Sequence, residues 1–378
     1  MTDFEHILPL WRALENAGED YVLATIVAVE GSSYRKPGAR MIVAQDGRRA
    51  GTVSGGCLEA EVAKRAWWLS ESGPVVERYS TLEDDGDLPY GSGCGGVVYI
   101  LLERRRTASP LLHQLEAAFH ARSPLAIATV LEGPRMGERA FAGALNSRGA
   151  DSDSAQCAAL IQVARSAFST GASAEVTLPI EGVATRVWAD YRAARPGLWI
   201  FGAGDDAKPL VAMARELGWF VAVADGRAHL ATRGRFAQAD EVHPLAIAEL
   251  PHTAPNLALR AGDAAVLMTH SFEQDTRVLA WLLAGGRLPV AYVGVLGPQR
   301  RTREALAHAA RMNGIAPTAE LVEGWLEQLH APMGLDVGGD TSASVALSIL
   351  SEIQTTVAAA SAHPLREVRA TRAAALSA

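Results

Sequence analysis

The chain has 378 residues, and its 35 Lys and Arg against 42 Asp and Glu give a formal net charge of −7. Hydrophobic residues make up 49% of it, charged residues 20%, and 35 residues are glycine, so it is long enough for two or three domains and is not disordered as a whole. No early apolar stretch approaches the roughly 18–20 residues that cross a bilayer, and a net-acidic chain without a dense stripe of Lys and Arg is a poor candidate for nucleic-acid binding.

The chain begins with acidic residues where a signal peptide would carry basic ones, so a cytoplasmic location is expected. The first part then predicts a mixed α+β domain over residues 1–190, because helical and strand patterns follow one another without strict alternation. The predicted elements are a helix over 3–16, strands over 21–29 and 41–44, a helix over 57–70, a strand over 97–102, a helix over 154–166 and a strand over 183–188.

From Leu198 strands and helices alternate, which is typical of a doubly wound parallel sheet that buries both faces. A Rossmann-like domain is predicted over 197–362, after a linker over 192–197, and a flexible tail over 363–378. The predicted strands are 198–201, 220–224, 263–268 and 289–296, and the predicted helices are 205–217, 273–284, 299–312 and 340–357.

Gly31 to Arg40 form a loop with three cations, Arg35, Lys36 and Arg40, among its glycines. Positive charge on a flexible backbone in an acidic chain indicates an anion-binding loop that could wrap a phosphate. Arg48 and Arg49 could reinforce it. The alternative is a solvated hairpin loop with no ligand.

Two of the three cysteines have glycines beside them. Cys57 follows Gly55 and Gly56 at the start of a predicted helix, where the helix dipole lowers the pKa of a thiol. Cys94 precedes Gly95 directly before a strand, so close approach of a ligand explains it better than core packing does. Such thiols suit a soft metal or sulfur chemistry, and the alternative is that both are small buried side chains.

The third cysteine, Cys157, shares a helical face with Leu160 and Ala164 and is expected in the core. Three cysteines cannot build a disulfide framework, and no CxxC pair indicates a structural zinc site.

Gly202 and Gly204 lie in a GxGxxA motif between a predicted strand and helix, and Asp225 ends the next strand. Glycines here allow a tight turn and close approach of a phosphate, and the acid can bind a ribose diol, so the motif strongly predicts a Rossmann turn. It predicts a bound dinucleotide less strongly. Asp205 and Asp206 would oppose a pyrophosphate there.

Lys208 and Arg227 offset only part of that negative charge. A nucleotide site and a purely structural turn therefore both remain open at this point.

His270 follows the strand 263–268 and could share a ligand crevice with Asp275, Gly297 and Gly204, because ligands bind outside the carboxyl ends of strands in open α/β sheets. A lone histidine at a strand end is, however, more often a hydrogen-bonding structural residue.

An ordered set of motifs runs through the chain. They are Gly31-Ser-Ser with Pro37-Gly-Ala-Arg-Met41, Gly51-Thr-Val-Ser-Gly-Gly-Cys-Leu-Glu59, Gly93-Cys-Gly-Gly96, Phe201-Gly-Ala-Gly204, Asp225-Gly-Arg227, Thr269-His270, Gly294-Val-Leu-Gly297 and Gly334-Leu-Asp-Val-Gly338. Over roughly residues 10–360 this set resembles the XdhC/CoxI family, accessory proteins for xanthine dehydrogenase and related molybdenum hydroxylases. One position departs from the family, which usually has His where this chain has Asp205.

The resemblance implies a chaperone that binds the molybdenum cofactor, as molybdopterin or its dinucleotide form, protects it during sulfuration and passes it to an apo molybdenum hydroxylase. It also implies a cysteine desulfurase as partner and a homodimer, and catalysis is not required. The predicted cofactor contacts are Cys57, Cys94, Arg35, Lys36, Arg40, Gly55, Gly56, Gly95, Gly202, Gly204, Asp225, Arg227 and His270, with Cys57 and Cys94 as candidate contacts of molybdenum.

Two other classes of function stay open. The first is an NAD(P)-dependent oxidoreductase that uses the Rossmann domain with His270 as acid and base, which Asp205 and Asp206 disfavour. The second is a purely structural partner-binding protein, in which both thiols would be inert.

Overall fold

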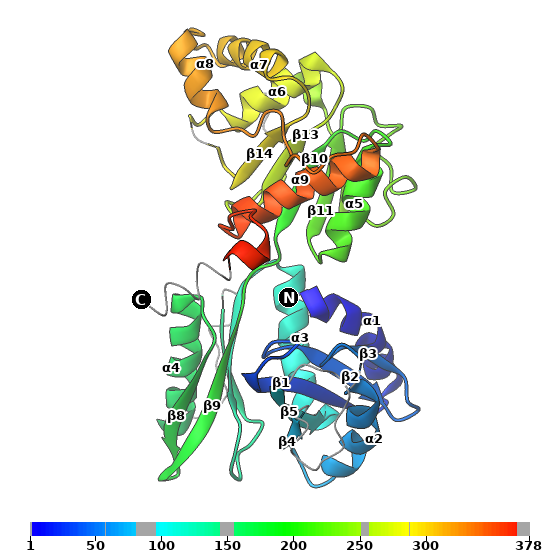
Figure 1. Cartoon of the computed structure of the whole chain (residues 1–378), viewed down its shortest axis with the longest axis vertical. Helices are drawn as coiled ribbons and strands as arrows, with labels where there is room; N and C mark the ends of the chain where they lie inside the picture. Colours follow the sequence, from blue (N-terminus) through cyan, green and yellow to red (C-terminus); the bar gives the residue numbers. More distant parts are fainter. Residues whose placement is uncertain are drawn as a thin grey trace. The chain divides into compact units, whose positions relative to one another are not determined.

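The computed structural model describes residues 2–56, 58–80, 96–143, 155–250, 257–286 and 288–368 (Figure 1). The chain divides into two compact units, Met1–Arg195 and Pro196–Ala378. Each unit has hydrophobic clusters of its own and is described by itself below.

The first unit holds two antiparallel sheets. A five-stranded sheet, here called the first sheet, has the order β3-β2-β1-β5-β4, and a four-stranded one, the second sheet, has the order β7-β6-β9-β8. The strands are β1 (Tyr21–Gly31), β2 (Arg40–Ala44), β3 (Arg49–Gly51), β4 (Val75–Ser80), β5 (Gly96–Arg104), β6 (Leu125–Val130), β7 (Arg139–Gly143), β8 (Ala174–Ile180) and β9 (Val183–Arg192). The helices are α1 (Thr2–Ala17), α2 (Glu59–Leu69), α3 (Arg105–His120) and α4 (Ala155–Thr170).

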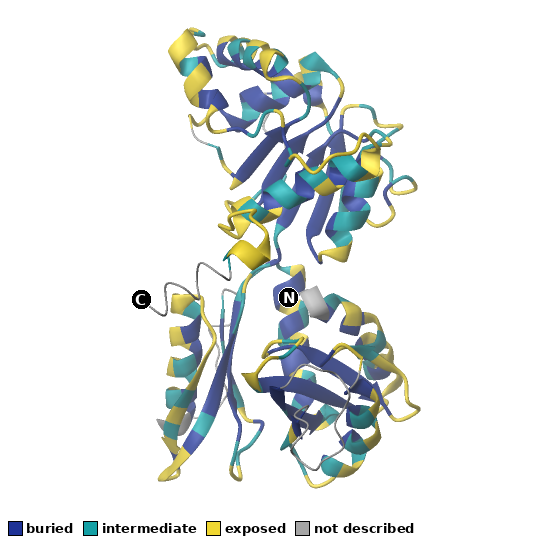
Figure 2. Cartoon of the chain, in the orientation of Figure 1, coloured by how far each residue is buried: buried dark blue, intermediate teal, exposed yellow. Residues whose placement is uncertain are grey.

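Strand β1 is apolar along most of its length because both faces of the first sheet are covered (Figure 2). Leu23 packs in the cluster with α1 and α3, whereas its neighbour Val22 packs in the cluster with α2 on the opposite face. This alternation follows the two-residue period of a strand. Cys157 is buried on α4, as expected.

A buried ion pair ties the two sheets of this unit together. Arg139 of β7 donates from Nη1 to Oε1 of Glu103 of β5 at 2.8 Å, and Glu103 is fully buried. Leu125 and Ile127 of β6 also join the cluster of α1 and α3, so apolar packing reinforces the same junction.

The second unit is a parallel sheet with the order β12-β11-β10-β13-β14. Its strands are β10 (Gly197–Phe201), β11 (Phe220–Asp225), β12 (Glu241–Pro244), β13 (Ala264–Leu267) and β14 (Tyr292–Val295). Its helices are α5 (Ala207–Glu216), η1 (Ile247–Glu249), α6 (Phe272–Leu282), α7 (Gln299–Met312), α8 (Ala319–Leu326) and α9 (Ser342–Val357). The predicted mixed α+β domain followed by a Rossmann-like sheet is thus confirmed.

The order of the strands reverses between β10 and β13, which is the position where open α/β sheets bind ligands. His330 adds a parallel bridge beyond β14, because its N–H donates to the carbonyl of Val293 and its carbonyl accepts from Val295, both at 2.9 Å. Helices α5 and α9 cover one face, and α6, α7 and α8 cover the other (Figure 1).

In the part of the chain that the structure describes, no helix combines the length and the apolar character that crossing a bilayer requires.

Candidate functional site

The loops of the first sheet that carry the predicted ligand residues all leave its same end. Gly31, the last residue of β1, pairs with Gly96, the first residue of β5. The first residues of β2 and the last residue of β3 lie at the same end of the sheet. We call this edge the loop end of the first sheet, comprising residues 31–40, 51–56 and 58, and Gly96. Cys57, Cys94 and Gly95, three of the predicted contacts, lie outside the described residues.

The loop over 31–40 is shaped by two turns. Ser33 Oγ donates to the carbonyl of Arg35 at 2.8 Å, and the N–H of Ala39 donates to the carbonyl of Lys36 at 3.1 Å. The second turn needs glycine at Gly38, whose φ is +91°. Its N–H also donates to β1, so the turn is held against the sheet while Lys36 stays exposed and Arg35 is half-buried.

Arg40 is separated from the exposed cations of this loop. Its Nη2 lies 2.9 Å from Oδ2 of Asp190, which also accepts from Nε of Arg192 at 2.9 Å, and its Nη1 donates to the carbonyl of Gly38. Burial lowers the pKa of Arg40 to about 10. A Cβ at Gly38 would lie 1.3 Å from Nη2 of Arg192, so Gly38 leaves room for that side chain. Arg40 therefore anchors the loop to β9 of the second sheet.

Arg48 and Arg49 lie in the hairpin at the other end of β2. Arg48 pairs there with Asp46 and Glu19, at 2.5 and 2.8 Å. Five residues of β2 separate this hairpin from the loop end, about 15 Å of strand. The two arginines thus do not join the cations of residues 31–40.

Ser54 and Glu59, to which the sequence patterns gave no role, hold the glycine pair Gly55-Gly56. Ser54 Oγ donates to Oε2 of Glu59 at 2.5 Å and accepts from the N–H groups of Gly56 and Leu58 at 3.0 and 3.1 Å. Oε1 of Glu59 accepts from the N–H of Ser54 at 2.8 Å. Burial alone would raise the pKa of Glu59, but these hydrogen bonds outweigh it and lower that pKa.

The available sequence signal was an acid near the start of the predicted helix, five residues after a serine. On its own, that pattern also suits an exposed helix start.

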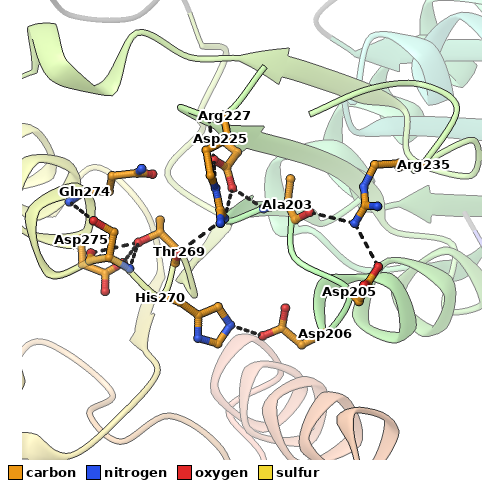
Figure 3. Close-up of polar contacts among 11 residues, drawn as sticks. Ala203, Asp205, Asp206, Asp225, Arg227, Arg235, Thr269, His270, Gln274 and Asp275 are labelled. Atoms are coloured by element: carbon orange, nitrogen blue, oxygen red, sulfur yellow. Dashed lines mark hydrogen bonds and ion pairs between the residues drawn. The ribbon is translucent and has the colours of Figure 1, made fainter. Parts of the chain in front are cut away.

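In the second unit, Asp225 is turned inward at the end of β11 (Figure 3). Its Oδ2 accepts from the N–H of Ala203 at 2.7 Å and from Nη2 of Arg227 at 2.8 Å, and its Oδ1 accepts from the N–H and Nε of Arg227. Burial would raise the pKa of Asp225, but the hydrogen bonds from Arg227 and Ala203 lower it. The carboxylate that would bind a ribose diol is thus fully buried and holds the Rossmann turn.

The two glycines of that turn differ in how strictly their surroundings exclude a side chain. Gly202 has φ +135°, and a Cβ there would lie 2.3 Å from the carbonyl oxygen of Met268, so the backbone directly after β13 excludes any side chain. A Cβ at Gly204 would meet Oδ1 of Asp206 at 2.4 Å, which a rotation of that side chain could relieve.

Both acids after the turn have local partners. Asp205 is 78% exposed and pairs with Lys208 at 2.7 Å and Arg235 at 2.9 Å, which lower its pKa. Oδ2 of Asp206 lies 2.7 Å from Nε2 of His270, and Figure 3 shows these two side chains pointing toward one another. Both carboxylates therefore have side-chain partners, and two of these, Arg235 and His270, were not indicated as partners by the sequence.

Residues after β13 form a second polar network at this edge. Thr269 Oγ1 donates to Oδ1 of Asp275 at 2.7 Å, and Oδ2 of Asp275 pairs with Nη2 of Arg301 at 2.7 Å. Burial raises the pKa of Asp275 although Thr269 and Arg301 oppose this shift. His270 has φ +59° and its side chain is 59% exposed, so it is the accessible member of the group.

Apart from Arg40, which is paired with Asp190, the described candidate residues thus form two groups. Arg35, Lys36, Gly55 and Gly56 lie at the loop end of the first sheet, and Gly202, Gly204, Asp225, Arg227 and His270 lie at the carboxyl edge of the parallel sheet. Within the described residues, no group of three or more His, Cys, Asp or Glu side chains could hold a metal ion.

Comparisons with known proteins place this arrangement among relatives. The chain matches a model of the XdhC and CoxI family over residues 14–80 and a model of the XdhC Rossmann domain over 198–353. It is 30% identical over 344 residues to a probable xanthine dehydrogenase subunit of Bacillus subtilis (strain 168), across 90% of this chain and 94% of that protein.

A shorter match, 37% identical over 105 residues, is to the molybdenum cofactor insertion chaperone PaoD of Escherichia coli (strain K12), across 25% of this chain and 30% of that protein. The crystal structure of a xanthine dehydrogenase from Bacillus halodurans aligns with a TM-score of 0.72 at 28% identity, across 96% of this chain and 97% of that one.

Proposed function

Because the chain belongs to the XdhC and CoxI family, we propose that it is an accessory protein that binds the molybdenum cofactor as cargo and delivers it to a molybdenum hydroxylase of the xanthine dehydrogenase type. The name of PaoD, a molybdenum cofactor insertion chaperone, supports this role. In the proposal, the protein protects the cofactor while its terminal sulfur ligand is installed by a cysteine desulfurase. It acts in the cytoplasm as a homodimer and need not catalyse a reaction.

The observation that carries the proposal is the loop end of the first sheet. The cargo is a pterin that bears a phosphate and a dithiolene, so it presents an anion for cations and a face for backbone contact. Lys36 is exposed there and Arg35 is half-buried, beside the loop that Ser54 and Glu59 hold in place. A cation that contacts a phosphate forms a charge-assisted hydrogen bond, which is stronger than a neutral one.

Cys57 and Cys94 remain the proposed contacts of molybdenum. The chain neighbours of Cys57 support this assignment, because the N–H groups of Gly56 and Leu58 both donate to Ser54 Oγ at the loop end. Gly96, two residues after Cys94, begins β5 at the same edge. A thiolate is a soft ligand that suits a metal with sulfur ligands.

A nicotinamide-dependent oxidoreductase is the competing function, and the geometry of Asp225 argues against it. Both oxygens of Asp225 are occupied by Ala203 and Arg227, so ribose binding would require breaking these hydrogen bonds. His270 and the exposed part of Arg227 remain the proposed contacts at this edge.

The test is anaerobic isolation of the full chain from cells that make the cofactor, followed by measurement of molybdenum and of oxidised-pterin fluorescence. We expect both in the wild-type protein and a loss of molybdenum in Cys94→Ala. Lys36→Ala should weaken retention about 10- to 150-fold, since a hydrogen bond to a charged group contributes about 1.5–3 kcal/mol.

Arg49→Ala is the matched control for Lys36→Ala, because Arg49 is an exposed cation in the hairpin at the opposite end of β2 from the loop end. This variant should retain the cofactor fully. Wild-type protein without molybdenum or pterin would rule out the proposal. Calorimetry with NADH and NADPH tests the competing enzyme, which micromolar binding abolished by Gly204→Val would favour.

A further inference from the structure

Tyr34 lies in the loop between Ser33 and Arg35 and is unusually exposed for an aromatic residue. Its exposure of 73% is the highest of any large hydrophobic side chain among the described residues. Within the same described residues its hydroxyl has no hydrogen bond. Core packing therefore does not account for an aromatic side chain at this position.

The ring of Tyr34 nevertheless lies over the backbone on one side. A Cβ built on Gly55 would lie 3.7, 3.8 and 3.9 Å from Cγ, Cδ1 and Cδ2 of the ring. Three ring atoms at nearly equal distances mean that the flat face of the ring covers Gly55. Since the side chain as a whole is mostly exposed, the opposite face of the ring is open to solvent.

The backbone under the ring, around Gly55, is itself fixed by hydrogen bonds. Gly55 lies between Ser54 and Gly56, whose backbone N–H groups are bound by Glu59 and by Ser54 Oγ, respectively. Glu59 is 5% exposed and accepts from the loop at both carboxylate oxygens. An aromatic ring resting on a fixed backbone loses little freedom when a second flat surface binds to it, which favours stacking.

The positive charge of Lys36, near Tyr34, indicates that a planar ligand stacked on the ring also carries an anionic group. Lys36, two residues later, is exposed, and the turn that follows it is pinned to β1 through the N–H of Gly38. A ligand that covers the open face of the ring while contacting Lys36 combines a planar heteroaromatic system with an anion. Base rings stack on protein aromatics without needing specific hydrogen bonds.

We propose that Tyr34 is a stacking platform for the pterin ring of the cargo, with Lys36 contacting its phosphate. This inference rests on the proposed function and deepens it, because it identifies which part of the cofactor the loop end recognises. It also predicts that the ring alone, without molybdenum, is recognised by the protein.

The experiment titrates the full-length protein into 6-carboxypterin, a fluorescent pterin whose carboxylate supplies the anion, and follows the quenching of its emission. Wild type should quench and bind, and Tyr34→Ala should weaken binding about 5- to 150-fold, the range for removing one base-stacking aromatic. Tyr34→Phe should bind within about threefold of wild type, since it keeps the ring and loses only an unbonded hydroxyl.

Trp68→Ala is the control, because Trp68 is an equally exposed aromatic, 69%, on α2 outside this loop. It should bind like wild type. Equal binding by Tyr34→Ala and wild type would overturn the inference, as would a loss in Tyr34→Phe as large as in Tyr34→Ala.

The two proposals fail in distinguishable ways. Pterin and molybdenum in the isolated Tyr34→Ala protein at wild-type levels would overturn the stacking role and leave the chaperone function standing. Their absence from wild type, together with no quenching of 6-carboxypterin, would overturn both. An unchanged unfolding transition in Tyr34→Ala, expected for so exposed a side chain, shows that a loss of binding is local.

Discussion

Three buried acidic side chains hold the backbone at the two candidate sites, and the sequence motifs pointed to only one of them, Asp225, as a ligand contact. Asp190 accepts from Arg40 and Arg192, Glu59 accepts from Ser54, and Asp225 accepts from Ala203 and Arg227. A buried carboxylate that accepts several hydrogen bonds is stabilised in its charged form. Removing it leaves its donors without partners, so these acids affect the sites without touching a ligand.

Asp190→Ala should strongly destabilise the first unit. The substitution leaves the guanidinium groups of Arg40 and Arg192 buried without their carboxylate, and breaking a buried pair costs about 3–5 kcal/mol. Urea unfolding followed by circular dichroism measures this change in the free energy of unfolding.

Asp46→Ala is the matched control, because Asp46 pairs with Arg48 on the surface. Asp46 also accepts from the N–H of Arg48 at 2.9 Å, so we expect only a small fall in the free energy of unfolding, well below that of Asp190→Ala. A similar small effect of both substitutions would show that the Arg40 cluster does not stabilise the unit.

At the scale of elements, the sequence predicted the helices and strands that have strong hydrophobic patterns and missed several whose patterns are weak. Strand β1 and the alternating elements of the second unit follow from long apolar runs. Helix α3 was not predicted, because Pro110 and the basic residues at its start interrupt its apolar pattern. Edge strands such as β8 and β12 were missed because one side of an edge strand faces solvent and its residues are only partly apolar.

Gly202→Ala tests the turn between β10 and α5. A side chain there adopts an unfavourable φ and meets the carbonyl oxygen of Met268, directly after β13, at 2.3 Å, and this backbone cannot move aside cheaply. We expect the free energy of unfolding of the second unit to fall by about 2–4 kcal/mol.

Gly234→Ala is the control for this substitution. No atom lies within 4 Å of a Cβ at Gly234, and its φ is not in the left-handed region, so the change should be neutral or slightly stabilising. Thermal unfolding of both variants measures the difference, and a Gly202→Ala protein as stable as Gly234→Ala would contradict the assigned constraint.

At the scale of the whole molecule, the chain consists of two units with separate hydrophobic clusters. The proposed pterin platform lies in the first unit, and the Rossmann turn lies in the second. Each unit is well within the size at which a domain can fold alone.

Residues 1–195 and 196–378, produced separately, should therefore each give a cooperative unfolding transition. Circular dichroism during urea titration is the measurement, with the intact chain as reference. A fragment that shows no cooperative transition would indicate that its stability depends on the other unit.

The sequence by itself determined the classes of structure, because hydrophobic periodicity and glycine turns depend on residues close together in the chain. It indicated the Rossmann turn at Gly202 and Gly204, the strand–helix alternation that follows, and the cations of the loop over 31–40. These features needed no knowledge of distant contacts.

Only the tertiary structure decided which polar groups remain available to a ligand. Arg40 meets Asp190 from 150 residues away, His270 meets Asp206 from 64, and Ala203 meets Asp225 from 22. The energy of such a pair depends on burial and on the distance between charges, which a local pattern does not specify. For that reason the sequence predicted Arg40 and Asp225 as ligand contacts without indicating Asp190, Ala203 and Arg227 as the partners that engage them in the folded chain.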